Sequence, residues 1–302
     1  MALLWGIDLG GTKIEGVVLE GRSPDQVVLR RRIDTESRHG YQHILQRIVL
    51  LIREMEHELG VTAAGLGMGT PGAIDPPTGL LKNSNTVCLN QQPFHRDIED
   101  LLKIPVRIAN DANCFALAEA QMGVVASEMP EAAVVFGVIM GTGVGGGVVV
   151  NGQVLGGRHG IGGEWGHNFL DDSGGACYCG KTGCVERVIS GTALQRFYAD
   201  AAGEERKLRE IYQRHQAGVD QHATATIDRL IHFFGKGIST VINILDPDAI
   251  VLGGGVGNID LLYTEGVKAV EPYIFNPRVN TRFLRPALGD SAGVFGAALL
   301  NP

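Results

Sequence analysis

Hydrophobic residues recur along the chain with two different periods. Short apolar runs at residues 3–7, 14–19 and 27–33 predict three strands near the N-terminus. Between residues 44 and 59 apolar side chains follow one another at intervals of three and four, as they do on one face of a helix. The chain therefore opens with a predicted β-β-β-α order.

Strands and helices keep alternating toward the C-terminus. Further predicted strands lie at residues 66–68, 106–109, 133–140, 147–150 and 249–252, and predicted helices near residues 98–102, 112–122 and 227–245. Asp246 and Pro247 end the last of these helices, because proline cannot continue one. Such alternation is typical of an α/β fold.

The two halves of the chain resemble each other. A shift of 131 residues superposes five residues on identical ones: Gly10, Gly16, Val17, Val18 and Gly21 on Gly141, Gly147, Val148, Val149 and Gly152. Because both segments are rich in Gly and Val, this repeat supports a duplication without proving it. The chain has 302 residues, against roughly 150 for an average domain, and no low-complexity linker. We therefore expect two domains that share a broad interface and a cleft.

Composition excludes several classes of function. The 26 Lys and Arg residues are outnumbered by 33 Asp and Glu, which gives a net charge of −7, whereas binding to a phosphate backbone usually needs a basic surface. No apolar run approaches the roughly 18 residues of a membrane span, and the N-terminus has no basic region of a signal peptide. We therefore expect no nucleic acid and no membrane as partners, and a cytoplasmic location.

A glycine-rich turn joins the first two predicted strands. Gly10 and Gly11 follow Asp8 and precede Thr12 and Lys13. Glycine lets backbone N–H groups approach an anion without interference from a Cβ, and Thr and Lys can donate hydrogen bonds to phosphate oxygens. We expect a phosphate-binding hairpin in which Asp8 holds Mg²⁺ through water. An ordinary tight Gly-Gly turn is the alternative.

A second glycine turn stands at the corresponding place in the repeat. Gly141, Thr142 and Gly143 follow a predicted strand, and with Gly146 they match the pattern G-x-G-x-x-G. In a dinucleotide-binding Rossmann fold this pattern opens a helix, whereas here another strand is predicted at residues 147–150. We therefore reject the Rossmann interpretation and expect a second phosphate hairpin.

Two further glycine motifs need separate treatment. Gly253, Gly254 and Gly255 follow a predicted strand and suit close approach to a nucleoside, or form a tight loop. Residues 175–182 satisfy the P-loop expression G-x-x-x-x-G-K-[ST], but no strand precedes them and two cysteines lie inside the proposed loop. We do not interpret this match as a P-loop.

Three of the five cysteines lie close together. Cys177, Cys179 and Cys184, with His167 ten positions before the first, offer three thiolates and one imidazole. This Cys3His set can complete a tetrahedral zinc shell, which predicts a structural zinc ion. Free buried or redox-active thiols are the alternative.

Carboxylate and amide side chains accompany these motifs. Asp111 follows a predicted strand and opens a helix, so it is a candidate general base, with a helix cap as the alternative. Glu164 and Glu186 flank the cysteines and could accept hydrogen bonds from a polyhydroxylated substrate. Asn85 lies in a turn-rich loop that suits sugar hydroxyls but is equally common in turns.

Together these motifs resemble the ROK family of sugar kinases. The resemblance rests on five motifs that occur in order: Asp8-Leu-Gly-Gly-Thr-Lys13, Asn110-Asp111-Ala-Asn113, Gly141-Thr-Gly-Val-Gly-Gly-Gly147, Glu164-Trp-Gly-His167 and Cys177-Tyr-Cys-Gly-Lys-Thr-Gly-Cys184-Val-Glu186. It extends to Gly289 and Asp290, and so covers nearly the whole chain. Because the phosphate turn begins at Asp8, we expect none of the N-terminal DNA-binding domain that the repressors in that family carry.

The resemblance implies an α/β chain with the actin-like ATPase (ribonuclease H-like) fold, in which two domains flank a cleft that holds ATP, Mg²⁺ and a hexose. It places residues 1–110 plus 290–302 in the smaller domain and residues 111–289 in the larger one. The family's sugar-binding positions correspond to Gly72, Asn85, Asn110, Asp111, Glu164, His167 and Glu186. His167 would also bind zinc, through its other ring nitrogen.

The activity implied is transfer of the γ-phosphoryl group of ATP to the 6-hydroxyl of a hexose, with Asp111 as general base. Residues 82–85 and 89–94 are most similar to bacterial fructokinases, so we expect fructose, and also mannose, as the substrate. Glucokinase and N-acetylhexosamine kinase are the alternatives within the family, and a sugar sensor without kinase activity is the alternative outside enzymes. The family also suggests a homodimer.

Overall fold

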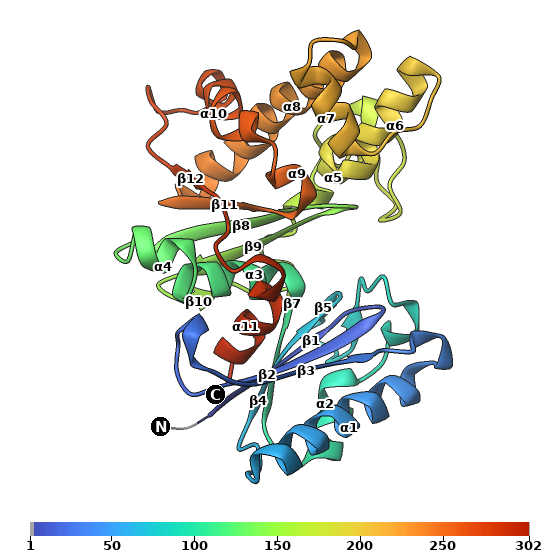
Figure 1. Ribbon diagram of the computed structural model, residues 1–302, viewed down its shortest axis with the longest axis vertical. Helices are drawn as coiled ribbons and strands as arrows, with labels where there is room; N and C mark the ends of the chain where they lie inside the picture. The colour runs from blue at the N-terminus through green and yellow to red at the C-terminus, as the bar shows by residue number, and fades with distance from the viewer. Residues whose placement is uncertain (1–2, 302) are drawn as a thin grey trace. The chain divides into compact units, whose positions relative to one another are not determined.

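The computed structural model describes residues 3–301 and divides into two compact units (Figure 1). The first unit contains residues 3–130, Gly147–Gly162 and residues 287–301. The second contains Glu131–Gly146 and Gly163–Pro286. The chain thus passes from the first unit to the second, back and across again before it returns to the first.

A five-stranded sheet forms the centre of the first unit. Its strands are β1 (Leu4–Leu9), β2 (Lys13–Leu19), β3 (Val27–Asp34), β4 (Leu66–Thr70) and β7 (Val106–Asn110), in the order β3-β2-β1-β4-β7. β2 is antiparallel to β1 and β3, whereas β1, β4 and β7 are parallel to one another. Consequently the carboxyl ends of β1, β4 and β7 meet at one edge of the sheet.

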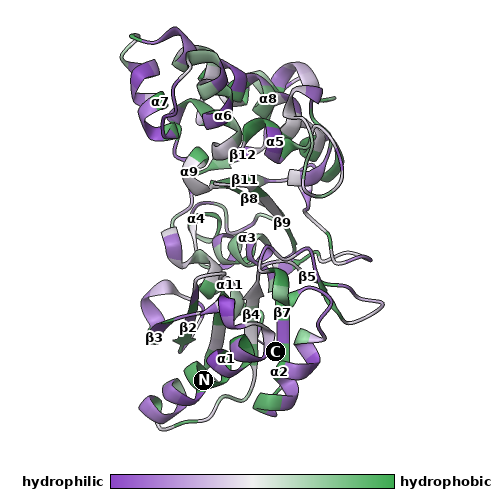
Figure 2. Cartoon of the chain, turned by 90° about the vertical axis from the view of Figure 1, so that its right-hand side faces the viewer, coloured by the Kyte–Doolittle hydropathy of each residue, from purple (hydrophilic) through white to green (hydrophobic). Residues whose placement is uncertain are grey.

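Helices cover both faces of this sheet (Figure 1). α1 (Tyr41–Leu59) and α2 (Phe94–Leu102) lie on one face, and α1 buries an apolar stripe while its other side stays polar (Figure 2). On the other face α11 (Ala292–Leu299) packs so closely on β1 that a Cβ on Gly6 would overlap the backbone of Ala298. α3 (Asp111–Gln121) packs against α11.

Shorter elements complete the first unit. They are β5 (Ala73–Ile74), β6 (Leu81–Lys82), α4 (Val124–Glu128), β10 (Gln153–Val154), and single 3-10 turns at Pro24–Gln26, Ser37–His39, Val87–Leu89 and Gly289–Ser291. β5 and β6 form a small antiparallel hairpin.

The second unit combines strands with a group of helices. Its strands are β8 (Val134–Met140), the start of β9 (Val144–Val150), β11 (Ala249–Gly253) and β12 (Arg282–Leu284), within the sheet order β10-β9-β8-β11-β12. Its helices are α5 (Val185–Ile189), α6 (Gly191–Ala202), α7 (Leu208–Gln216), α8 (Gln221–Leu245), α9 (Gly254–Gly257) and α10 (Glu265–Val270). Its 3-10 turns lie at Trp165–His167, Asp172–Gly174, Asp260–Tyr263 and Glu271–Tyr273.

Most predicted elements are present, and two features differ. The helices α5, α6 and α7 were not predicted, because residues 185–216 lack a long apolar stripe. The compact units also divide the chain differently from the predicted boundary at residue 110. α3 and the residues up to 130 group with the first unit, since Gly296 of α11 lies directly against the backbone of Cys114.

The sequence predicts no membrane-spanning segment, and the helices of the structure can be compared with this prediction. Among the described residues, each helix is either too short or too polar to cross a bilayer.

Candidate active site

Two carboxylates lie at the strand edge of the first unit. Asp8 is near the end of β1, and Asp111 begins α3 directly after β7. Burial, followed by the charges of Asp111 and Glu15, raises the pKa of Asp8 to about 6 against the lowering effect of Arg32. Desolvation also raises the pKa of Asp111 above its usual value, although the backbone N–H of Ala112 donates to its carboxylate at 2.8 Å. Two carboxylates that repel each other at one edge form a suitable place for a divalent cation.

The surroundings hold Asp8 in place. A Cβ on Gly69 would lie 3.3 Å from Asp8 Oδ1, and a Cβ on Gly293 would lie 3.0 Å from Asp8 Oδ2. Both positions therefore admit only glycine without a shift of the carboxylate. The Sγ of Cys114 is equally near Gly69, at 3.2 Å from the same added Cβ.

The helix cap at the start of α3 is Asn110. Its side-chain oxygen accepts the N–H of Asn113 at 2.8 Å. The alternative interpretation of Asp111 as the N-cap residue is therefore wrong, although one of its carboxylate oxygens accepts the N–H of Ala112 in the first turn. Asn110, a predicted sugar-binding residue, is buried and has this capping role as well.

The first glycine turn has the predicted position. The N–H of Gly10 donates to the carbonyl of Lys13 at 2.9 Å, which closes the turn between β1 and β2. Gly11, Thr12 and Lys13 are exposed, so their donors can reach a ligand. A Cβ on Gly11 would lie 3.3 Å from Thr86 Oγ1, so a larger residue would crowd the loop that carries Asn85.

Of the two predicted sugar-binding residues near this loop, Gly72 has a structural role and Asn85 is exposed. Gly72 has φ of +93°, and a Cβ there would overlap the carbonyl of Lys82, so this glycine is required by the chain path itself. Asn85 is exposed, and its side-chain oxygen lies 3.5 Å from Thr86 Oγ1. Asn85 is therefore the member of this loop with a side chain available to a substrate.

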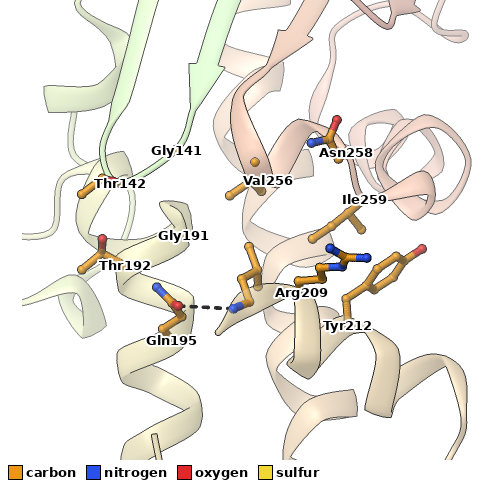
Figure 3. Close-up of a pocket in the computed structure, with 12 residues that line it drawn as sticks. Gly141, Thr142, Gly191, Thr192, Gln195, Arg209, Tyr212, Val256, Asn258 and Ile259 are labelled. Carbon is orange, nitrogen blue, oxygen red and sulfur yellow. Dashed lines mark hydrogen bonds between the residues drawn. The ribbon is translucent and has the colours of Figure 1, made fainter. Parts of the chain in front are cut away.

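In the second unit, the turn between β8 and β9 borders a cavity of about 590 Å³ (Figure 3). Gly141 and Thr142 line it on one side, and Gly255 lines it from the start of α9. The structure thus brings together residues of two glycine motifs that the sequence analysis treated separately. We call this cavity the helix pocket.

The rest of the helix pocket was not predicted. Thr192 and Gln195 of α6, Arg209 and Tyr212 of α7, and Asn258 after α9 line it (Figure 3). Gln195 accepts the backbone N–H of Leu208 at 3.3 Å, which ties α6 to α7. These residues lie on the surfaces of helices, where no motif marks them. An aromatic ring, a guanidinium and amides around one cavity suit a flat, polar base.

The other two residues of the third glycine motif have structural roles. Gly253 ends β11, and Gly254 has φ of +78°, where an added Cβ would overlap the carbonyl of Met140. A side chain at position 254 would have no room there. Gly254 therefore lets β11 turn into α9 and so places Gly255 at the helix pocket.

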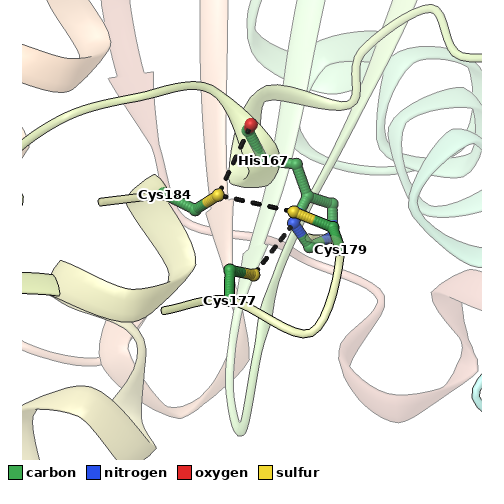
Figure 4. A group of neighbouring side chains, drawn as sticks. All are labelled: His167, Cys177, Cys179 and Cys184. Carbon is green, nitrogen blue, oxygen red and sulfur yellow. Dashed lines mark hydrogen bonds between the residues drawn. The ribbon is translucent and has the colours of Figure 1, made fainter. Parts of the chain in front are cut away.

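The four predicted metal ligands lie together (Figure 4). The ligand atoms of His167, Cys177, Cys179 and Cys184 all lie within 4.8 Å of one another. Burial, with the neighbouring thiols, raises the pKa of the Cys184 thiol to about 12. Three sulfur atoms and one imidazole nitrogen at this spacing are the donors that Zn²⁺ takes in a tetrahedral shell, so the donor set fits zinc.

The two ring nitrogens of His167 face different groups. Nδ1 lies 3.7 Å from Cys177 Sγ and faces the cysteines, while Nε2 lies 3.0 Å from the hydroxyl of Tyr178. The Tyr178 ring meets the imidazole edge to face, with centroids 5.2 Å apart. Nδ1 is therefore the metal-facing nitrogen, and Nε2 is the one that could contact a substrate.

Tyr178 is a residue that the sequence analysis missed. Burial raises its pKa to about 12, and the charges of Glu186 and Glu164 also contribute. Its hydroxyl thus lies near all three residues of this loop that were predicted to bind sugar. The only signal was its place between Cys177 and Cys179, two of the predicted metal ligands.

Glu186 connects the segment that carries the cysteines, residues 163–186, to the second glycine turn, and we call this segment the cysteine loop. Its Oε2 accepts the N–H of Val144 at 3.0 Å, and a Cβ on Gly143 would overlap the same oxygen. Glu164 lies directly before the 3-10 turn Trp165–His167. A rigid cysteine loop would therefore hold Glu164, His167 and Glu186 in fixed positions.

The P-loop match fails on structure as well. Residues 175–182 follow a 3-10 turn, Asp172–Gly174, instead of a strand, and they contain the two cysteines of the cluster. The rejection of a Rossmann turn is also confirmed, since β9 is a strand.

Comparison with known proteins is consistent with this geometry. The model of the ROK family matches residues 4–302. An N-acetyl-D-glucosamine kinase of Pasteurella multocida is 36% identical over 98% of both chains.

Two solved structures show the same fold. A ROK hexokinase from Thermus thermophilus is 33% identical, with a TM-score of 0.87 over 99% of this chain and 97% of that one. A ROK family glucokinase from Streptomyces griseus, solved with glucose and AMPPNP, is 26% identical, with a TM-score of 0.77 over 99% of both. The chain therefore belongs to the ROK family and has the actin-like ATPase fold of its sugar kinases.

Proposed function

We propose that this protein is an ATP-dependent sugar kinase that phosphorylates the 6-hydroxyl of N-acetyl-D-glucosamine. The observation that carries the reaction type is the Asp8 and Asp111 pair at one strand edge, where both carboxyl pKa values are raised. The observation that supports the substrate is similarity to N-acetyl-D-glucosamine kinases along 98% of the chain. The relatives thus favour the alternative over the fructose and mannose preference expected from residues 82–94.

Asp111 is the general base in this proposal. Its raised pKa makes the carboxylate a better proton acceptor, and Asn110 already caps α3, so Asp111 can point its second oxygen at a sugar hydroxyl. Proton removal as the oxygen attacks the γ-phosphorus would contribute about 10²- to 10⁴-fold to the rate.

The nucleotide is assigned to the glycine turns and the helix pocket. The cavity has room for a nucleoside, with Tyr212 and Arg209 on one side and Gly255 on another. Backbone N–H groups of the turns at Gly10–Lys13 and Gly141–Gly143 would bind the phosphates. Mg²⁺, when bound near Asp8, would neutralise charge on the phosphates.

The sugar is assigned to Asn85, Asn110, Asp111, Glu164, His167 and Glu186. Their side chains offer carboxylate, amide and imidazole groups, which are suitable partners for hydroxyl and acetamido groups. Zinc would act on this set indirectly, by fixing the loop that carries Glu164, His167 and Glu186.

The test measures ADP release from Mg·ATP with each of five sugars: N-acetylglucosamine, N-acetylmannosamine, glucose, mannose and fructose. The proposal expects the highest kcat/KM for N-acetylglucosamine. A higher value for fructose would restore the expectation drawn from residues 82–94. Sugar binding by calorimetry without any ADP release would instead favour a sensor.

A further inference from the structure

Three arginines of the second unit lie near the cysteine loop, and among the described residues none of them forms a direct ion pair with a carboxylate. Arg187 belongs to α5, Arg196 to α6 and Arg229 to α8. Arg196 Nη2 donates to the carbonyl of Arg187 at 3.0 Å, which holds the first two side by side. All three are half-buried.

Arg229 is held firmly in this group. Its guanidinium carbon lies 4.9 Å from the ring centroid of Phe197 and 4.7 Å from that of Phe233, so it contacts both rings. Its Nη2 donates to Ser173 Oγ at 2.7 Å. Ser173 lies in the 3-10 turn of the cysteine loop, so Arg229 ties this loop to α8.

The group has unused hydrogen-bond donors. Among the described residues, the buried Nε atoms of Arg187 and Arg229 have no hydrogen-bond partner. A buried guanidinium N–H without an acceptor is unfavourable, because the group loses its hydrogen bond to water and gains no other. Two such donors within one group of arginines indicate that an acceptor is missing.

Electrostatics supports the same conclusion. Burial lowers the pKa of Arg196 and the charge of Arg187 adds to this, whereas Asp200 raises it. Burial also lowers the pKa of Arg229 and the charge of Arg196 adds to this, whereas Asp171 raises it. Arg206 elsewhere in the chain behaves differently: the hydrogen bond that it donates to Glu204 raises its pKa.

The nearby acids offset the charge of the group only in part. The hydroxyl of Ser173 accepts from Arg229 and donates to Asp171, so the Asp171 carboxylate acts on Arg229 through this hydroxyl and not by a direct ion pair among the described contacts. Asp200 is exposed and acts on Arg196 only from a distance, without a hydrogen bond or ion pair among the described contacts.

We propose that Arg187, Arg196 and Arg229 form a binding site for a phosphate-type oxyanion, separate from the site of phosphoryl transfer. Guanidinium groups bind phosphate through several parallel N–H donors. Through Ser173, the anion would stabilise the cysteine loop. The anion is either inorganic phosphate or the phosphate group of a sugar phosphate.

The experiment measures binding of inorganic phosphate and, in a second arm, of N-acetylglucosamine 6-phosphate by calorimetry. The variants are Arg196→Gln, Arg196→Lys and Arg187→Gln. Arg206→Gln is the matched control, because it removes one positive charge of the same unit where a carboxylate partner exists. Any phosphate that binds at the kinase site is common to all variants, so differences between them report the arginine group.

The proposal expects Arg196→Gln and Arg187→Gln to weaken phosphate binding at least tenfold and Arg206→Gln to leave it unchanged. Phosphate should also raise the unfolding midpoint of the wild type more than that of Arg196→Gln. The arm with the greater difference identifies the source of the anion.

Three results would overturn the proposal: no phosphate binding by the wild type, equal binding by all variants, or a change in oligomeric mass with Arg196→Gln. The last would show that the arginines bind a carboxylate of a second copy. If Arg196→Gln fails to fold, Arg196→Lys and Arg187→Gln give the same comparison. None of these readouts depends on kinase activity, so failure here leaves the proposed function untouched.

Discussion

The acidic pair of the first unit and the cysteine cluster of the second each bring together groups that repel one another when ionised, but the atoms differ. Asp8 and Asp111 bring two carboxylates together, and the cluster brings three thiols and an imidazole together. Oxygen donors suit a hard cation that exchanges quickly, whereas sulfur and nitrogen donors suit Zn²⁺, which stays bound. The first arrangement is suited to a reaction and the second to rigidity.

The largest expected effect follows loss of the metal from the cysteine cluster. We expect about one zinc per chain by elemental analysis and none in Cys179→Ser, because a closed shell needs all four ligands; binding in such sites is worth on the order of 10 kcal/mol. Hydrogen exchange should then rise first in residues 163–186. Cys88→Ser, outside the cluster, should keep its zinc, and metal retained in Cys179→Ser would refute the ligand set.

The next effect separates chemistry from structure. Asp111→Asn should lower kcat by about 10²- to 10⁴-fold, since an amide cannot accept the proton. Its unfolding midpoint should stay near the wild-type value, because Asn110 caps α3. Turnover within a few-fold of wild type would remove Asp111 from its role.

Asp8 should lower the stability of the folded protein when no cation is bound, because its carboxylate is buried near Asp111. Its pKa rises from 3.8 to about 6, so between these values the folded protein binds more protons than the unfolded chain, and stability falls as pH rises through this window. Above pH 6 the cost is constant, and Asp8→Asn should stabilise the free protein at pH 7.5 by up to about 3 kcal/mol. Thermal unfolding with and without Mg²⁺ checks this, and a destabilised variant would contradict it.

Gly141 and Gly143 of the second glycine turn differ in their surroundings: the first borders open space and the second borders a side chain of the protein. A Cβ on Gly141 would meet no atom within 4 Å, so Gly141→Ala should keep its stability while KM for ATP rises by roughly tenfold if phosphate occupies that space. A Cβ on Gly143 would overlap Glu186, so Gly143→Ala should also lose stability. Equal unfolding midpoints for the two variants would contradict this contrast.

The smallest effect concerns Tyr178. Tyr178→Phe removes the hydroxyl beside His167 Nε2 and should change KM for the sugar by about two- to five-fold, with kcat and zinc content unchanged, as expected for loss of one hydrogen bond at an exposed site. Tyr273→Phe serves as a control outside the site. A loss of zinc in Tyr178→Phe would show a structural role instead.

The same two regions show what a sequence can predict. The cysteine cluster could be predicted because its four members lie within eighteen positions, so the sequence itself shows them close together. Asp8 and Asp111 lie far apart in the chain, and only the parallel order of β1, β4 and β7 brings them to one edge. The resemblance to a family supplied that order.

The helix pocket could not be predicted in the same way. Gln195, Arg209 and Tyr212 lie on two helices with no motif of their own, and only the packing of α6 against α7 brings them together. The arginine group is a similar case, since Arg187, Arg196 and Arg229 come from three helices. Residues gathered by packing leave no periodic trace in the sequence.

One competition experiment tests the central claim most directly. The protein is given Mg·ATP with equal amounts of N-acetylglucosamine, glucose, mannose and fructose, and the products are identified by phosphorus and proton NMR. Our account predicts N-acetylglucosamine 6-phosphate as the main product, and none of it with Asp111→Asn over the same time. A mixture dominated by fructose 6-phosphate, a phosphate on another hydroxyl, or no sugar phosphate at all would contradict it.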